Sequence, residues 1–207
     1  MKALHHIDQC GIVILAGGQS SRLGSPKQLL PFGGTALVVR VADEACRLKL
    51  YPVIVVLGAH APKIMPYLNI PGLSVVVNEG WEEGMASSIR KGIEAMDLNH
   101  PHVDGIMFLV CDQPHLSHSL IQQLIELQDE TGSPAAACAY NGKLGTPALF
   151  HKTLFPALLQ LKGDIGARKI LEEMKEDVTI LDFEEGRIDI DTMADYHQLL
   201  NEKKGEA

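Results

Sequence analysis

One segment near the start of the chain combines small residues with two cations in a spacing suited to phosphate binding. The run Ile12–Ala16 is apolar, too short for a helix and closed by glycines, so it predicts a buried strand. Gly17 and Gly18 let the backbone turn sharply and approach a ligand closely. Consecutive N–H groups in such a turn can cradle phosphate oxygens, and Arg22 and Lys27 add positive charge. An ordinary strand-to-helix turn is the alternative, and the two cations favour the phosphate site.

The spacing of this loop excludes two well-known phosphate-binding motifs. The dinucleotide fingerprint G-x-G-x-x-G fails because Gly17 and Gly18 are adjacent and Gln19 follows. The Walker pattern fails because Lys27 follows a proline and precedes a glutamine. The loop instead resembles L-A-G-G-x-S-x-R-x-G-x-x-K, the motif of the MobA-like nucleotidyltransferases. The matching positions are Leu15, Ala16, Gly17, Gly18, Ser20, Arg22, Gly24 and Lys27.

Length, composition and charge restrict the class of protein. A chain of 207 residues, 46% of them hydrophobic, suits a single α/β domain spanning residues 1–207. The net charge of -8 argues against general nucleic-acid binding. No stretch approaches membrane-spanning length and no signal peptide is evident, so we expect no membrane partner and a cytoplasmic location. The four cysteines lack paired metal-ligand spacing, which predicts reduced thiols and no zinc site.

Helix and strand patterns alternate along the chain, which is typical of a parallel sheet wrapped by helices. Strand patterns cover 53–57, 73–77, 105–110 and 135–140, and Thr35 and Ser117 are the expected caps of two helices. The resemblance implies a Rossmann-like nucleotidyltransferase fold, with a mostly parallel sheet and helices on both faces. Ligands of such sheets gather beyond the carboxyl ends of the strands, so the residues that follow each strand are the candidates.

Carboxylates at two places in the sequence are candidate metal ligands. Asp112 follows the strand 105–110, where a carboxylate can bind Mg²⁺ or cap a turn, and the family's C/G-D-x-P motif favours the metal. Asp189 and Asp191 would lie on the same side of a short extended segment. A solvated edge strand followed by a helix cap is the alternative there. The family's D-I-D-T-P-x-D motif implies that Asp191 rather than Asp189 completes the metal site, although Met193 replaces the motif's proline.

The segment from Asn78 to Ile89 resembles the family's N-x-x-W-x-x-G-M-x-x-S-L segment. Its serines fall in the first turn of a predicted helix, where free N–H groups and hydroxyls can meet phosphate or ribose. The resemblance implies nucleotide contacts for Asn78, Gly84 and Ser88, whereas Trp81 is expected to pack against the core. A capping cluster without ligand contacts is the alternative.

Two later segments resemble the G-x-P and G-D-x-G-x-R motifs of the molybdenum-cofactor cytidylyltransferase branch, which line the acceptor side. Arg168 would suit a pterin phosphate through its bidentate fork. Turn chemistry is the alternative for both segments, and Asp164 can instead cap its helix. The residues to which the resemblance assigns substrate binding are Gly145, Pro147, Asp164 and Arg168.

The resemblance implies an enzyme that transfers a nucleoside monophosphate, with CMP from CTP favoured, to the phosphate of molybdopterin and releases pyrophosphate. Arg22, Lys27 and Asp112 are the expected catalytic residues, and Mg²⁺ between Asp112 and Asp191 is the expected cofactor. A phosphate nucleophile is already ionised at neutral pH, so no general base is needed. A molybdoenzyme is the protein partner that such a product allows.

Other functions stay open at this point. Ala16-Gly17-Gly18 resembles the guanylyltransferase branch, because the cytidylyl branch usually carries Ala-Ala-Gly, and an extra position without a Cβ leaves room for a larger base. A sugar-1-phosphate nucleotidyltransferase would use the same kind of phosphate-binding loop and the same kind of Mg²⁺ site. A non-catalytic carrier or insertion chaperone for a molybdoenzyme is the alternative from another class, and the presence of Lys27, Asp112 and Asp191 argues against it.

Overall fold

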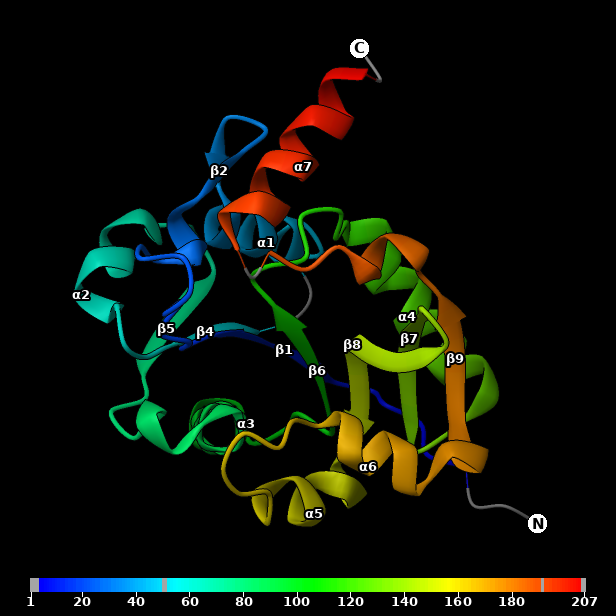
Figure 1. The fold of residues 1–207 in the computed structure, drawn as a ribbon. Coiled ribbons are helices and arrows are strands. Elements are labelled where there is room, and N and C mark those ends of the chain that lie inside the picture. Colours follow the sequence, from blue (N-terminus) through cyan, green and yellow to red (C-terminus); the bar gives the residue numbers. More distant parts are fainter. Residues whose placement is uncertain (1–3, 50–51, 191, 206–207) are drawn as a thin grey trace.

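The computed structural model describes residues 4–49, 52–190 and 192–205. At its centre is a seven-stranded sheet in the order β5-β4-β1-β6-β8-β7-β9 (Figure 1). Only β8 runs antiparallel to its neighbours, so the predicted mostly parallel sheet is confirmed. The strands are β1 (Cys10–Ala16), β4 (Val53–Leu57), β5 (Leu73–Val77), β6 (Gly105–Val110), β7 (Ala135–Tyr140), β8 (Lys143–His151) and β9 (Val178–Asp182), with β2 (Pro31–Phe32) and β3 (Thr35–Ala36) forming a separate hairpin.

Helices cover both faces of the sheet. They are α1 (Leu37–Cys46), α2 (Ala61–Ile64), α3 (Met85–Asn99), α4 (His118–Thr131), α5 (Phe155–Leu159) and α6 (Arg168–Glu173). A further helix, α7 (Met193–Gly205), packs outside the sheet. One core cluster packs α1, α2 and α4 on one face, and a second packs α3, α5 and α6 on the other (Figure 1). Strand β1 serves both clusters, because successive side chains point to opposite faces: Ile12 and Ile14 enter the first and Val13 and Leu15 the second.

A third apolar cluster lies outside the sheet and joins the glycine loop to the C-terminal helix. Leu23 from the loop and Ile190 from the segment before α7 are both buried in it. The Tyr196 hydroxyl on α7 donates a hydrogen bond to the Pro31 carbonyl at 2.6 Å, which fixes the helix beside β2 (Figure 1). The cluster therefore holds the segment after β9 close to the loop after β1. Its buried members are Leu23, Leu30, Phe32, Leu37, Ile190, Tyr196 and Leu199.

Two local predictions have different outcomes. Ser117 caps α4 as expected, since its Oγ accepts a hydrogen bond from the Leu120 N–H at 3.3 Å. The prediction that Thr35 caps a helix is wrong, because Thr35 pairs with Phe32 in the β2–β3 hairpin and α1 begins only at Leu37. The polar and glycine residues before Leu37 resemble a helix start in the sequence, but they form this short hairpin instead.

The cysteines are structural. All four are free thiols, and Cys10, Cys111 and Cys138 are buried. Burial raises the pKa of each of these three thiols to about 12, so they stay protonated at neutral pH. Within the described ranges, no helix combines the length and the apolarity that a bilayer crossing requires.

The Glu44 side chain on α1 caps the N-terminus of α4. One carboxylate oxygen accepts the His118 backbone N–H at 2.8 Å and lies 2.9 Å from His118 Nδ1. The other oxygen lies 3.1 Å from Arg47 Nη1. Burial acts to raise the pKa of Glu44, but the hydrogen bonds from His118 outweigh burial and hold this pKa below its ordinary value. The carboxylate therefore stabilises the fold at neutral pH, and its contribution is lost as the pH falls through the lowered pKa.

We expect Glu44→Gln to lower the free energy of unfolding by about 1 kcal/mol at neutral pH, because the capping carboxylate is lost. The deficit should shrink at about pH 3, where the wild-type carboxyl group is also largely protonated when unfolded. Urea unfolding at the two pH values measures this difference. The exposed Glu94→Gln serves as the control, and a deficit of equal size at both pH values would contradict the assignment.

Candidate active site

The predicted phosphate-binding and metal-binding residues follow strands of the central sheet, and the carboxyl ends of β1 and β6 meet at one edge of it. Strand β1 pairs in parallel with β4 on one side and β6 on the other. The glycine loop after β1 therefore lies beside Asp112, which comes two residues after β6. Two cavities open at this edge. We call them the loop cavity, of about 490 Å³, and the hairpin cavity, of about 520 Å³.

The loop cavity is bounded by the glycine loop, the start of α3 and the end of β6. Trp81 and Glu82 add a wall that sequence reasoning did not assign to a ligand site. Backbone N–H groups in a tight loop of this kind suit phosphate oxygens. The predicted nucleotide-binding residues that line this cavity are Leu15, Ala16, Gly17, Gly18, Lys27, Gly84 and Ser88.

A buried glutamine holds the glycine loop in shape. Gln28 is only 1% exposed, and its Nε2 donates hydrogen bonds to the Ala16 and Gly18 carbonyls at 3.0 and 2.9 Å. Ser20 closes the loop, because its Oγ accepts the Lys27 backbone N–H at 3.0 Å. Ser20 and Arg22, two predicted nucleotide ligands, do not line either cavity, and Arg22 is exposed.

Gly17 lies directly against the Ser88 side chain, and this contact leaves no room for a Cβ. A Cβ at this position would lie 2.9 Å from the Ser88 hydroxyl oxygen. The missing Cβ at Gly17 was expected to leave room for a larger base. In the structure the Ser88 hydroxyl takes up this room, so the missing Cβ does not favour a purine. Gly18, by contrast, has no heavy atom within 4 Å of its Cβ position and faces open space.

Asn78 organises the first turn of α3 from behind the loop cavity. Its side chain is 6% exposed, and its Nδ2 donates to the hydroxyls of Ser87 and Ser88 at 2.8 and 3.1 Å. Its Oδ1 accepts the Gly80 N–H at 3.0 Å. The structure thus places Asn78 against Ser88 and not among the residues that line either cavity. Its position orients the hydroxyl of Ser88, which does line the loop cavity.

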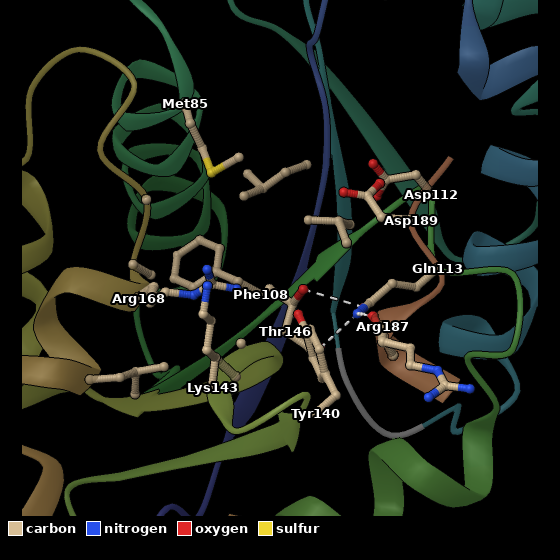
Figure 2. A pocket seen from close by; sticks show the side chains of 18 of the residues that line it. Met85, Phe108, Asp112, Gln113, Tyr140, Lys143, Thr146, Arg168, Arg187 and Asp189 are labelled. Carbon is tan, nitrogen blue, oxygen red and sulfur yellow. Dashed lines mark hydrogen bonds between the residues drawn. The ribbon is translucent and has the colours of Figure 1, made fainter. Parts of the chain in front are cut away.

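Lys27 and two carboxylates form the most strongly charged part of the site. The Lys27 ammonium pairs with Asp112, and the Asp189 carboxylate lies 3.9 Å from the same nitrogen. Figure 2 shows Asp112 and Asp189 side by side at the top of the hairpin cavity. Burial acts to lower the pKa of Lys27, but the charge and hydrogen bond of Asp112 outweigh burial and raise the pKa above its ordinary value. Lys27 therefore stays charged in the working range of pH.

The acidic segment near the C-terminus forms no strand over its described residues 188–190, although the backbone of Ile188 is extended. It leaves a 3₁₀ turn at Glu184–Arg187 and reaches α7 at Met193. Asp189 is 59% exposed at its side chain and faces Lys27. Asp191, the predicted second metal ligand, lies outside the described residues. Asp189 is thus the described carboxylate that the segment brings to Asp112.

The hairpin cavity is bounded by the β7–β8 hairpin and the start of α6. Of the predicted acceptor residues, Gly145, Asp164 and Arg168 line it, whereas Pro147 is buried outside its lining. Asp164 does not cap α6, whose first turn follows Ala167 without a side-chain cap, so that alternative is wrong. A hydrogen bond of 2.7 Å from the Arg168 Nε to the Leu144 carbonyl fixes this side chain.

Sequence reasoning missed Lys143, which lines the hairpin cavity from the first position of β8. The signal was present in the dipeptide Asn141-Gly142 between two apolar runs. Both residues have positive φ, 51° and 69°, which is the backbone of a tight hairpin turn. Reading this dipeptide as a hairpin predicts β8 and places Lys143 opposite Tyr140.

A loop that can hold a polyphosphate and a second cavity that shares Asp112 with it allow a nucleotide to meet another substrate. The fold and the site therefore define a nucleotide-dependent transferase. Residues 12–178 match the family described as the MobA-like NTP transferase domain. The chain belongs to this family and is a nucleotidyltransferase.

Curated relatives align with most of the chain. Nicotine blue oxidoreductase of Paenarthrobacter nicotinovorans is 32% identical over 200 residues, 91% of this chain and 95% of the relative. Purine catabolism protein PucB of Bacillus subtilis is 32% identical over 172 residues, 77% of this chain and 79% of the relative. A molybdenum cofactor guanylyltransferase of Vibrio atlanticus is 29% identical over 176 residues, 83% of each chain.

A solved structure shares the whole architecture. Rv0371c of Mycobacterium tuberculosis superposes with a TM-score of 0.81 at 31% identity, covering 97% of this chain and 100% of that chain. The same protein has been solved in complex with manganese, with a TM-score of 0.77 at 28% identity over 93% of this chain and 98% of that chain. Members of the family generally use a divalent metal.

The residues at the sheet edge fit such a metal. Asp112 and Asp189 are oxygen donors that face a common cation in Lys27. Among the described residues no cluster of three or more histidine, cysteine, aspartate or glutamate side chains is present. Mg²⁺ is usually held by one or two carboxylates together with substrate phosphates and water, so a carboxylate pair beside a phosphate loop suits it.

We expect Lys27→Met to bind Mn²⁺ alone about tenfold more tightly than the wild type, because the ammonium group competes with the metal for the same carboxylates. The same variant should bind a nucleoside triphosphate more weakly. Titration of free Mn²⁺ by electron paramagnetic resonance, without nucleotide, measures the first effect. The exposed Lys63→Met is the control, and unchanged or weaker Mn²⁺ binding by Lys27→Met would show that Lys27 does not occupy the cation position.

Proposed function

We propose that the protein transfers a nucleoside monophosphate, CMP from CTP by preference, to the phosphate of a molybdopterin-type acceptor and releases pyrophosphate. The observation that carries the proposal is the junction of the two cavities. Asp112 and Asp164 line both the loop cavity and the hairpin cavity, so a triphosphate in one and an acceptor in the other would meet beside them. We place this reaction in the cytoplasm, where the thiols would stay reduced.

The residues supply binding and charge stabilisation rather than proton transfer. An oxygen of the acceptor phosphate forms a bond to the α-phosphorus of the triphosphate, and the bond from this phosphorus to the bridging oxygen of the leaving pyrophosphate breaks. Loop N–H groups and Lys27 hold the β- and γ-phosphates and stabilise the charge that develops on the leaving group. Arg22 adds positive charge at the outer side of the loop. Asp112 together with Asp189 or Asp191 would hold Mg²⁺, which would neutralise phosphate charge when bound.

The hairpin cavity supports a ring-containing acceptor with an anionic end. Phe108, Tyr140 and Met85 give it apolar walls, and Lys143 and Arg168 give it positive charge (Figure 2). A pterin that carries a phosphate presents both features. The relative in Vibrio atlanticus is named for molybdenum cofactor, which supports this class of acceptor. A molybdoenzyme that receives the product is the protein partner that we propose.

The identity of the base in the nucleotide is less well defined than the class of the acceptor. CTP is favoured by the segments Gly163–Arg168 and Gly84-Met85, which resemble the cytidylyl branch, and the corrected steric argument at Gly17 removes one reason for a purine. GTP is the second candidate, because Ala16-Gly17-Gly18 matches the guanylyl branch and the Vibrio atlanticus relative is named a guanylyltransferase.

Pyrophosphate release from the purified protein with Mg²⁺, molybdopterin and each triphosphate in turn tests the proposal. We expect release with CTP and a loss of at least about a hundredfold in kcat for Asp112→Asn, since a carboxylate of the metal site is removed. Release with GTP alone would transfer the assignment to the guanylyl reaction. In a parallel assay with a sugar 1-phosphate in place of molybdopterin, release only there would support the sugar nucleotidyltransferase. Triphosphate binding without any turnover would support the carrier.

A further inference from the structure

Gln113 connects three segments of the site through one buried side-chain amide. It directly follows Asp112 and is 3% exposed. Its Nε2 donates to the Thr146 carbonyl at 2.9 Å and to the Gly186 carbonyl at 3.2 Å. Its Oε1 accepts the Thr146 hydroxyl at 3.3 Å. All hydrogen-bonding groups of this amide are therefore used within the site, and Figure 2 shows it between Thr146 and Arg187.

The three connected segments carry different parts of the site. The first holds Asp112, which lines both cavities. The second is β8, where Thr146 forms part of the hairpin cavity. The third is the segment after β9, in which Gly186 stands three residues before Asp189. A single amide thus joins one carboxylate, the wall of the acceptor cavity and the segment that carries the other carboxylate.

The segment after β9 has little freedom to move against this amide. A Cβ at Gly186 would lie 2.7 Å from the Tyr140 ring and 2.6 Å from the Phe183 ring, so the backbone packs directly on both. On the far side of Asp189, Ile190 is buried in the third apolar cluster. The position of Asp189 is therefore set from two directions, by the Gln113–Gly186 hydrogen bond and by the apolar anchor at Ile190.

Only a glutamine satisfies this arrangement among side chains of similar size. Two carbonyl oxygens require two donors, and the Thr146 hydroxyl requires an acceptor, which the amide supplies together. A glutamate would place a charged acceptor against two carbonyl oxygens, and a methionine would leave both carbonyls without this donor. Unsatisfied buried acceptors of this kind destabilise their segment.

We propose that Gln113 is a positioning residue that holds Asp189 opposite Asp112, so that both carboxylates face the cation of the bound nucleotide. This inference rests on the proposed nucleotidyl transfer, because it concerns the metal–nucleotide complex of the same site. The effect acts through the Gly186 carbonyl and not through contact with nucleotide, since Gln113 lines the hairpin cavity and not the loop cavity. Outer residues that orient metal ligands typically change metal affinity or activity by about 10- to 100-fold.

The test compares Gln113→Met with the wild type in a complex with a non-hydrolysable triphosphate analogue. We expect the metal-free affinity for the analogue to stay within about twofold, because the glycine loop is untouched. Mn²⁺ affinity of the nucleotide complex, measured by electron paramagnetic resonance, should fall by about tenfold or more. In turnover, kcat should fall while KM for the triphosphate changes little. Gln122→Met on the exposed face of α4 is the matched control and should change none of these values.

A second variant and a double-mutant cycle give two further tests of the same role. Gln113→Asn retains the amide but is one methylene too short to reach both carbonyls, so it carries the same expectation if Gln113→Met does not fold. Asp189→Asn should lower Mn²⁺ affinity by itself, and Gln113→Met added to it should lower the affinity little further, because both act on one carboxylate.

The outcomes separate this inference from the proposed function. A wild-type protein that binds no Mn²⁺–triphosphate complex would overturn the proposed function. A wild-type protein that binds it while Gln113→Met binds Mn²⁺ equally well would overturn the positioning role alone. Parallel loss of metal-free nucleotide binding and of Mn²⁺ binding would also overturn it, because such a result indicates a general structural role.

Discussion

The site depends on the charge of Lys27 held against Asp112 and Asp189. These three groups come from the loop after β1, the end of β6 and the segment after β9, which are distant in sequence. Charges that are partly removed from water are stabilised by close partners, so each group depends on the position of the others. The loop, the sheet edge and the C-terminal segment must therefore all be in place before the site exists.

Two kinds of interaction bring these segments together. Two buried side-chain amides hold backbone segments in place. Gln28 holds the glycine loop, and Gln113 holds β8 together with the segment after β9. The third apolar cluster then joins Leu23 of the loop to Ile190 before α7. Polar side chains thus determine the local shape, whereas apolar burial determines which segments lie side by side. The glycines permit the turns but do not by themselves hold them.

Much of the fold and part of the site could be predicted from sequence pattern. The apolar run before Gly17 and the runs 105–110 and 135–140 gave strands with correct bounds or nearly so, because burial on both faces makes such runs distinctive. The position of Asp112 at the sheet edge followed from the same reasoning. The contact of Gly17 with Ser88 could not be predicted, because it joins residues that are remote in the chain. The direction of β8 depends on the Asn141-Gly142 turn, which the expectation of alternating helices and strands does not include.

The placement of Trp81 has a practical consequence. It is the single tryptophan of the chain, and it lies in the wall of the loop cavity. Its indole emission therefore arises at one known place, beside the start of α3, and no other indole contributes a background. A ligand bound in the loop cavity occupies the space that Trp81 lines. The protein thus carries its own optical reporter of occupancy, and no label has to be attached to follow binding in real time.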